Sequence, residues 1–212
     1  DSPSPQTRDM NPIYTGTYVS YIDTKQAARA AERAVLTAER FAVFAALLTG
    51  AAYPQAALAK AWTQLAYGAH HDAVTGSESD QVYLDLLTGW RDAWQLGCAA
   101  RDTALTVLSG LVAGAGSGTP VVVWNPVAQP RTDLVTVHPG GAFAAGARVL
   151  DSDGTECPAH VEAGSVSWLA RDVPSLGWRT FRLLPAATDG WTPVPGTVIA
   201  TEQHRLTADP TR

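Results

Sequence analysis

The sequence predicts a protein of the α+β class, in which an antiparallel three-helix bundle is followed by a small antiparallel β-sandwich-like domain. The composition changes near residue 114, from a segment rich in Ala, Leu, Glu and Arg to one rich in Val, Thr, Pro and Gly. Before that point apolar residues recur every three or four positions, and after it come short β-branched and aromatic runs separated by turns. We therefore expect two domains, residues 1–114 and 119–212, on either side of the flexible Gly/Ser-rich stretch at 113–120.

The first helix is expected over residues 23–50. Asp23 stands three residues before Gln26, an arrangement typical of a capping box in which Asp23 is the N-cap. Apolar side chains then follow at helical spacing, and Gly50 is expected to end the helix.

Two further helices are expected before the composition changes. The second begins at Pro54, a favoured residue in a first helical turn, and continues to Ala69. The third begins near Ser77 or Ser79 and carries apolar residues at helical spacing as far as Leu111. Because the connections are short, neighbouring helices should be antiparallel, which predicts the bundle.

The second half is predicted to consist of short strands. Each expected strand with its turn takes about 8–12 residues, the spacing of a sandwich or barrel. The chain closes on a strand leading into a turn at 198–212, so we expect the β domain to be truncated at its C-terminal end. The six earlier strands are expected at 120–126, 132–137, 147–151, 157–163, 165–173 and 177–185.

The segment AYGAHHDAVTGSES, residues 66–79, places His70, His71 and Asp72 side by side at the expected end of the second helix. Adjacent residues of an α-helix point about 100° apart, so at most one of these histidines should bind a given metal ion. Zinc takes about four ligands from His, Cys, Asp or Glu. The other histidines, at positions 138, 160 and 204, lie in the β half with no second ligand at a useful spacing. The chain should therefore not complete a metal site by itself.

Two other interpretations of the cluster are possible. Polar residues often decorate a helix C-terminus, where histidine interacts favourably with the helix dipole. The cluster also partly matches the His-His-x-x-x-Asp-Gly signature of condensation enzymes. In that signature the catalytic aspartate would stand at position 75, which is a threonine here.

The sequence resembles glycoside hydrolase family 38, the retaining α-mannosidases. Residues 70–77 resemble its His-His-Asp-Ala-Ile-x-Gly-Thr segment, with Ser77 in place of the final threonine. The resemblance continues in the same order over nearly the whole chain. It is carried by NPIYTGTYVSYIDTKQAARAAERAVLTAERFA, LAYGAHHDAVTGSESDQVYLDLLTGW, VVVWNPVAQPRTDLVTV, VPSLGWRTFRL and TEQHRLTADPTR.

This resemblance implies that the chain is a fragment, the helical domain and first β domain of a longer enzyme that hydrolyses terminal α-D-mannosides. It implies one zinc ion, bound by His71 and by ligands from an N-terminal catalytic domain outside this chain. Asp72 and His70 would bind the substrate, with Asp72 contacting sugar hydroxyls. The nucleophile and the acid/base would also lie outside the chain, so it should be inactive alone. The alternative is a non-catalytic carbohydrate-binding or structural module.

Charge and hydropathy exclude several other classes. The net charge of −5 and pI near 5.4 give no basic surface for nucleic acid. The apolar runs are too short to span a bilayer, and the N-terminus lacks the pattern of a signal peptide. Cys98 and Cys157 form neither a disulfide framework nor a cysteine zinc site. The compartment stays undetermined, with cytoplasmic and secreted locations both open.

Overall fold

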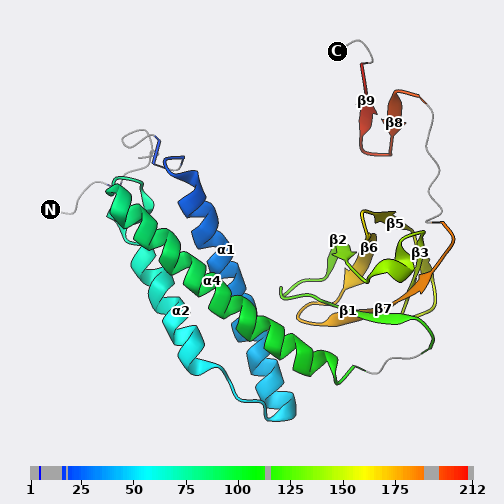
Figure 1. Cartoon of the computed structure of the whole chain (residues 1–212), viewed down its shortest axis with the longest axis horizontal. Coiled ribbons are helices and arrows are strands. Elements are labelled where there is room, and N and C mark those ends of the chain that lie inside the picture. Colours follow the sequence, from blue (N-terminus) through cyan, green and yellow to red (C-terminus); the bar gives the residue numbers. More distant parts are fainter. Residues whose placement is uncertain (1–4, 6–15, 18, 113–115, 189–195, 210–212) are drawn as a thin grey trace. The chain divides into compact units, whose positions relative to one another are not determined.

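The computed structural model describes residues 5, 16–17, 19–112, 116–188 and 196–209. The chain divides into two units, Asp1–Ala113 and Gly114–Arg212. The first is helical and the second is built from strands (Figure 1). The predicted α+β class is confirmed, and every strand pairing in the described residues is antiparallel. The first part of the predicted linker, 113–115, lies outside the described residues.

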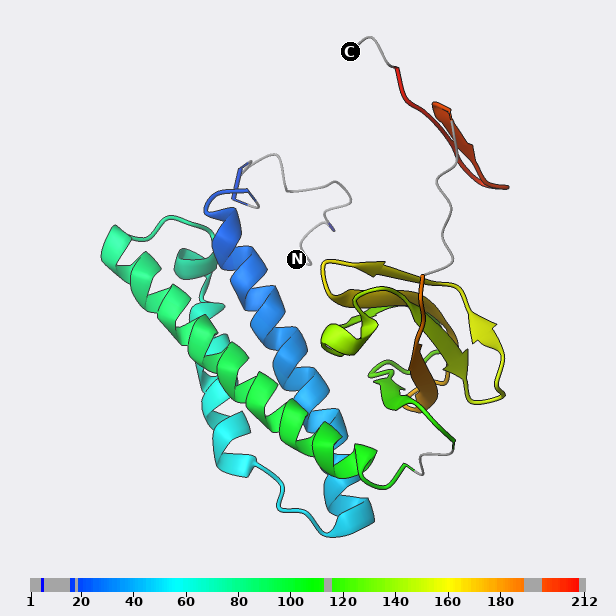
Figure 2. The same cartoon turned by 45° about the vertical axis from the view of Figure 1, so that its right-hand side comes forward.

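The helical unit contains four helices in its described residues, where the sequence predicts three. They are α1 (Ile22–Thr49), α2 (Gln55–Gly68), α3 (His71–Val74) and α4 (Asp80–Ser109). The three long helices pack against one another, and the chain reverses direction between consecutive ones (Figures 1 and 2). The additional helix is α3, a single turn between α2 and α4. It begins two residues after Ala69, the predicted end of the second helix, and it carries part of the His-His-Asp cluster. Among the described residues, none of the helices combines the length and the hydropathy needed to cross a bilayer.

The predicted start of α1 is wrong, whereas its predicted end is confirmed. The N-cap is Tyr21, which has a left-handed backbone (φ 45°) and makes no side-chain capping bond. Asp23 lies inside the first turn, where its carboxylate accepts a hydrogen bond from the Tyr83 hydroxyl instead of capping the helix. Gly50 ends α1 with φ 73°, and its N–H donates to the carbonyl of Ala46 at 2.9 Å. The starts of α2 and α4 agree with prediction more closely, since Pro54 and Ser79 are their N-caps.

Small side chains bring the long helices close together. Four alanines in the core of the helical unit have no exposed surface, namely Ala31, Ala38, Ala61 and Ala93. Trp90 of α4, the largest buried side chain of this core, is 1% exposed. Its indole lies against Gly68, where a β-carbon would come within 2.5 Å of the indole nitrogen. Close packing of this kind fixes the end of α2, and therefore the start of the segment that follows it.

Two sheets of the β unit share one buried cluster. The first sheet has the strand order β1-β7-β3-β4 and the second has the order β2-β6-β5. Trp168 of β6 and Phe181 of β7, one from each sheet, pack with ring centroids 5.4 Å apart. The bounds are β1 Thr119–Trp124, β2 Arg131–Val137, β3 Ala147–Asp151, β4 Glu156–Cys157, β5 Ala159–Glu162, β6 Ser165–Val173 and β7 Trp178–Pro185.

The strand predicted at 157–163 is in fact two strands. β4 pairs with β3 in the first sheet, and β5 pairs with β6 in the second. Pro158 separates them, and because proline has no N–H it cannot continue a ladder. A short 3₁₀ helix at Gly141–Phe143, also absent from the prediction, precedes β3. The final segment forms a hairpin of β8 (Val198–Ala200) and β9 (Arg205–Thr207).

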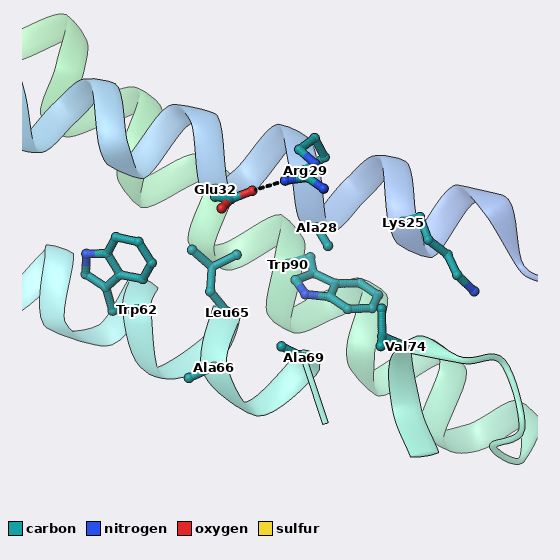
Figure 3. A pocket seen from close by; sticks show the side chains of 10 residues that line it. All are labelled: Lys25, Ala28, Arg29, Glu32, Trp62, Leu65, Ala66, Ala69, Val74 and Trp90. Atoms are coloured by element: carbon teal, nitrogen blue, oxygen red, sulfur yellow. Dashed lines mark hydrogen bonds and ion pairs between the residues drawn. The ribbon is translucent and has the colours of Figure 1, made fainter. Parts of the chain in front are cut away.

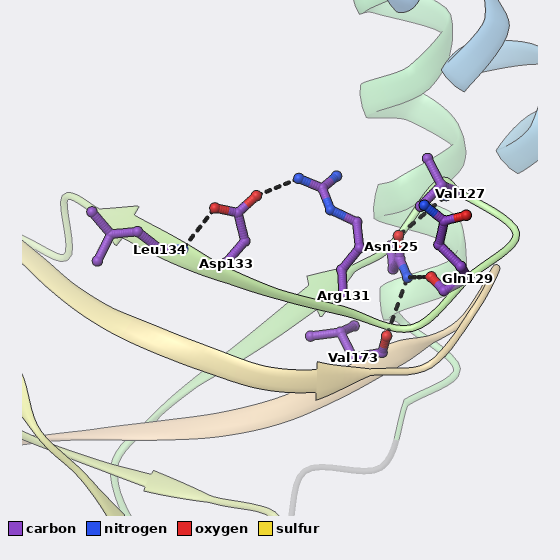
Figure 4. Close-up of polar contacts among 7 residues, drawn as sticks. All are labelled: Asn125, Val127, Gln129, Arg131, Asp133, Leu134 and Val173. Atoms are coloured by element: carbon purple, nitrogen blue, oxygen red, sulfur yellow. Dashed lines mark hydrogen bonds and ion pairs between the residues drawn. The ribbon is translucent and has the colours of Figure 1, made fainter. Parts of the chain in front are cut away.

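A buried asparagine fastens the connection between β1 and β2 to the end of β6 (Figure 4). Asn125 is 2% exposed, and its amide nitrogen donates to the carbonyls of Gln129, Val173 and Pro174 at 2.8–3.1 Å. Its amide oxygen accepts from the N–H of Val127 at 3.1 Å. The whole amide is therefore satisfied inside the protein, which explains how so polar a group is buried.

Candidate functional site

The His-His-Asp cluster lies between two helices, directly after the C-terminus of α2. α2 ends at Gly68 with Ala69 as its C-cap, and the backbone of His70 is extended (φ −54°, ψ 137°). His70 is the N-cap of α3, so His71 and Asp72 are its first two residues. His70 directly follows the C-cap of α2, and its N–H donates to the carbonyl of Tyr67 at 3.3 Å. The interruption removes the premise that the two imidazoles must point 100° apart.

The structure brings all three predicted site residues together. The rings of His70 and His71 stack with centroids 4.4 Å apart and an interplanar angle of 30°. Nε2 of His71 lies 3.3 Å from Oδ2 of Asp72. One ligand atom from each of the three residues falls in a group whose members all lie within 4.8 Å of one another. Among the described residues, no other group of three or more His, Cys, Asp or Glu side chains has this spacing.

The cluster is open to solvent. The side chains of His71 and Asp72 are 80% and 73% exposed. A polar contact with this exposure contributes little to stability, because water competes for both groups. The arrangement is therefore one that can receive a ligand at small energetic cost.

His70 differs from its neighbours because one of its ring nitrogens is already used. Nδ1 of His70 accepts a hydrogen bond from the backbone N–H of Asp72 at 3.3 Å, which caps α3. In the neutral imidazole this assignment places the proton on Nε2. His70 then offers an N–H donor to its surroundings, whereas His71 has no such capping bond.

The donor types and their spacing fit a zinc ion. Zinc binds imidazole nitrogen and carboxylate oxygen at about 2.0–2.2 Å, so neighbouring ligands of a tetrahedral site lie about 3.4 Å apart. The 3.3 Å between His71 Nε2 and Asp72 Oδ2 is close to that separation. The histidines at 138, 160 and 204 belong to the β unit, so His70 and His71 are the only imidazoles among the described residues of the helical unit.

A hollow of about 360 Å³ lies beside the cluster, between α1 and α2 (Figure 3). Trp90 lines it from α4, and Ala69 and Val74, the residues that flank the cluster on either side, line it near α3. Arg29 and Glu32 of α1 lie at its edge and form an ion pair of 2.8 Å. The hollow is mainly apolar with charged groups along one side. Sequence reasoning missed it, because it depends on how far α1 stands from α2.

The start of α1 lies against the loop that follows the cluster. Tyr21 and Tyr83 pack with ring centroids 4.9 Å apart. The hydrogen bond from Tyr83 to Asp23 raises the pKa of the phenol, because it stabilises the protonated form. Lys25 reaches back to the carbonyl of Ser20. These contacts tie α1, α4 and the loop together at the end of the unit that carries the cluster.

Part of the sequence matches a known family model. Residues 12–108, which include the three long helices almost entirely and the cluster, match the family model described as the alpha mannosidase middle domain. The match covers most of the helical unit, and the His-His-Asp turn lies inside the matched segment. No curated protein sequence matched the chain.

Solved structures resemble both the helical unit and the β unit in fold. One is an alpha-mannosidase from Enterococcus faecalis V583, with a TM-score of 0.70 and 19% identity over 89% of this chain. Another is a protein in glycosyl hydrolase family 38 from Enterococcus faecalis, with the same TM-score, identity and coverage of this chain. The chain covers 26% and 27% of the lengths of these two proteins, about a quarter.

Proposed function

We propose that this chain is part of a retaining α-mannosidase of glycoside hydrolase family 38, in which it supplies one zinc ligand, His71, and substrate contacts from Asp72 and His70. The middle-domain match and the shared fold support the family assignment. The single observation that carries the site assignment is the compact, exposed donor group of His70, His71 and Asp72 within the matched segment.

Each role follows from the polar atoms that the side chain exposes for binding. His71 has an exposed imidazole and binds the metal in its neutral form. Asp72 is exposed and accepts hydrogen bonds from sugar hydroxyls through its carboxylate. His70, whose Nδ1 holds the turn, donates to the substrate from Nε2. When bound, zinc would supply an electropositive template for the hydroxyls of the sugar.

The catalytic carboxyl groups of the proposed enzyme lie outside this chain. Retaining glycosidases use two carboxyl groups about 5–5.5 Å apart, one as nucleophile and one as acid and base. We assign both, together with the remaining zinc ligands, to an N-terminal catalytic domain that is the chief partner of this chain. The substrate is a glycan with terminal α-D-mannose, and the isolated chain does not turn it over.

The experiment is an assay of the 212-residue chain on an aryl α-mannoside with added zinc, in parallel with the longer protein that contains it. We expect turnover only from the longer protein, and loss of that turnover in its His71→Ala variant. Turnover by the isolated chain that disappears in His71→Ala would contradict the assignment of the catalytic groups. A longer protein that binds mannose but never cleaves the substrate would favour the non-catalytic alternative.

A further inference from the structure

The turn that carries the cluster is too short to hold itself together by helical hydrogen bonds. α3 has four residues, so its carbonyls have no partners of the usual i+4 kind within the helix. The carbonyl of His70 accepts from the N–H groups of Ala73 and Val74 at 2.9 and 3.0 Å. The carbonyl of Ala73 accepts from the N–H groups of Thr75 and Gly76. These four contacts use backbone donors alone.

Two of the remaining carbonyls, those of His71 and Asp72, accept from side-chain hydroxyls. Oγ1 of Thr75 donates to the carbonyl of His71 at 2.5 Å. Oγ of Ser77 donates to the carbonyl of Asp72 at 3.2 Å. The two hydroxyls also lie 3.2 Å from each other. The residues whose side chains form the exposed donor pair are therefore the ones whose backbones are held by hydroxyl groups.

Gly76 lies between Thr75 and Ser77 and packs closely against the residues that precede α1. Its backbone is left-handed (φ 82°), and a β-carbon there would lie 2.7 Å from Oγ of Ser20 and 2.9 Å from Cδ2 of Tyr21. Ser20 and Tyr21 are themselves fixed, the first by Lys25 and the second by the ring of Tyr83. A residue other than glycine would both strain the backbone and push the loop away.

We propose that Thr75, Gly76 and Ser77 are positioning residues, which hold His71 and Asp72 in the arrangement that the proposed zinc and sugar contacts require. The role deepens the proposed function, on which its link to zinc depends. Thr75 and Ser77 act through the backbones of the two donor residues, and Gly76 fixes the whole turn against α1. None of the three contributes a ligand atom to the donor group.

The test compares two double variants of the full 212-residue chain. Thr75→Val with Ser77→Ala removes both hydroxyls, and Thr75→Ser with Ser77→Thr keeps both. Without zinc, the first variant should lose the close ring contact of His70 with His71 in NMR spectra. Its amide exchange at Ala73, Val74 and Gly76 should become about tenfold faster, since two hydrogen bonds are lost. The hydroxyl-retaining variant should match the wild type in both measurements.

The second measurement titrates Zn²⁺ alone and follows the imidazole signals of His71. Loss of groups that orient a ligand weakens metal binding by about tenfold or more, so the variant without hydroxyls should bind zinc at least that much more weakly. Gly76→Ala, which keeps both hydroxyls, should produce a similar loss.

The outcomes separate the two claims. Unchanged ring contacts and exchange in the variant without hydroxyls would overturn the positioning role, as would exchange that rises equally throughout α1, α2 and α4. If exchange changes as expected but His71→Ala does not weaken Zn²⁺ binding by the longer protein, the positioning role stands and the proposed metal ligand is refuted.

Discussion

A β-carbon on Gly97 of α4 would lie 2.8 Å from the backbone nitrogen of Val35 in α1, and 2.9 Å from the carbonyl carbon of Ala34. The two helices thus approach until one backbone meets the other, and only a glycine fits between them. Backbone atoms cannot rotate away as a side chain can. The contact therefore sets the separation of α1 and α4, the two helices whose first residues surround the His-His-Asp turn.

Gly97→Ala should destabilise the helical unit by about 1–3 kcal/mol, because the added methyl group overpacks a rigid contact. Gly89→Ala on the same helix is the matched control. Its β-carbon would meet only the end of the flexible Gln64 side chain, so removal of a helical glycine should stabilise the unit by up to about 1 kcal/mol. Urea unfolding followed by circular dichroism gives both values. Equal effects of the two substitutions would show that α1 and α4 are not in tight contact at Gly97.

His70 and His71 should respond differently to substitution by asparagine. Asparagine is a favourable N-cap, so His70→Asn should keep α3 intact and leave zinc affinity within a few-fold of the wild type. His71→Asn removes the proposed ligand and should abolish measurable zinc binding by the chain. Isothermal titration with Zn²⁺ measures both. Stronger loss at position 70 than at position 71 would exchange the two assigned roles.

Asn125→Asp should destabilise the β unit by about 2–3 kcal/mol, since a carboxylate oxygen would replace the amide nitrogen that faces three carbonyls. The exposed Asp133→Asn serves as control. Asp133 pairs with Arg131 at the surface, where an ion pair contributes about 0–1 kcal/mol. Thermal unfolding at neutral pH compares the variants, and a small effect at position 125 would mean that the buried amide does not hold the β1–β2 connection.

The stability of the β unit should fall in acid partly through Glu156. Arg148 donates to its carboxylate at 2.7–3.1 Å, and these hydrogen bonds lower the pKa of Glu156 below its ordinary value of 4.5. A carboxylate whose pKa is lower in the folded state stabilises that state above pH 4.5, and the contribution is lost as the pH falls through the lowered pKa. Melting temperatures measured from pH 6 to pH 3 should therefore drop less steeply in Glu156→Gln. Because both side chains are about half exposed, high salt should shrink the difference.

The long helices could be predicted because their signals are local. The apolar spacing runs along each helix, and the cap residues Gly50 and Ser79 stand directly at the helix ends that they predict. The start of α1 could not be predicted in this way. The carboxylate of Asp23 binds the hydroxyl of Tyr83, which is 60 residues away in sequence, and a distant partner leaves no mark on the local pattern.

In the candidate site, too, local signals could be predicted from the sequence, whereas contacts between distant residues could not. The residue types of the cluster were sufficient to identify His70, His71 and Asp72 as a group, whereas their mutual orientation depended on where α2 ends. That end is set by the packing of Gly68 against Trp90, a tertiary contact. The sequence did contain one signal at the loop, since Thr75, Gly76 and Ser77 are typical turn residues. In the β unit, Pro158 was a comparable signal, and its effect was to move the chain from one sheet to the other.

The position of Trp90 gives the protein a built-in optical probe. Its indole is 1% exposed and lines the hollow next to the His-His-Asp turn. Emission from such a shielded ring is sensitive to any change in local polarity. A sugar, an inhibitor or a neighbouring polypeptide that enters the hollow would thus shift or quench fluorescence that originates within the protein, and its arrival could be followed in real time without attaching a dye.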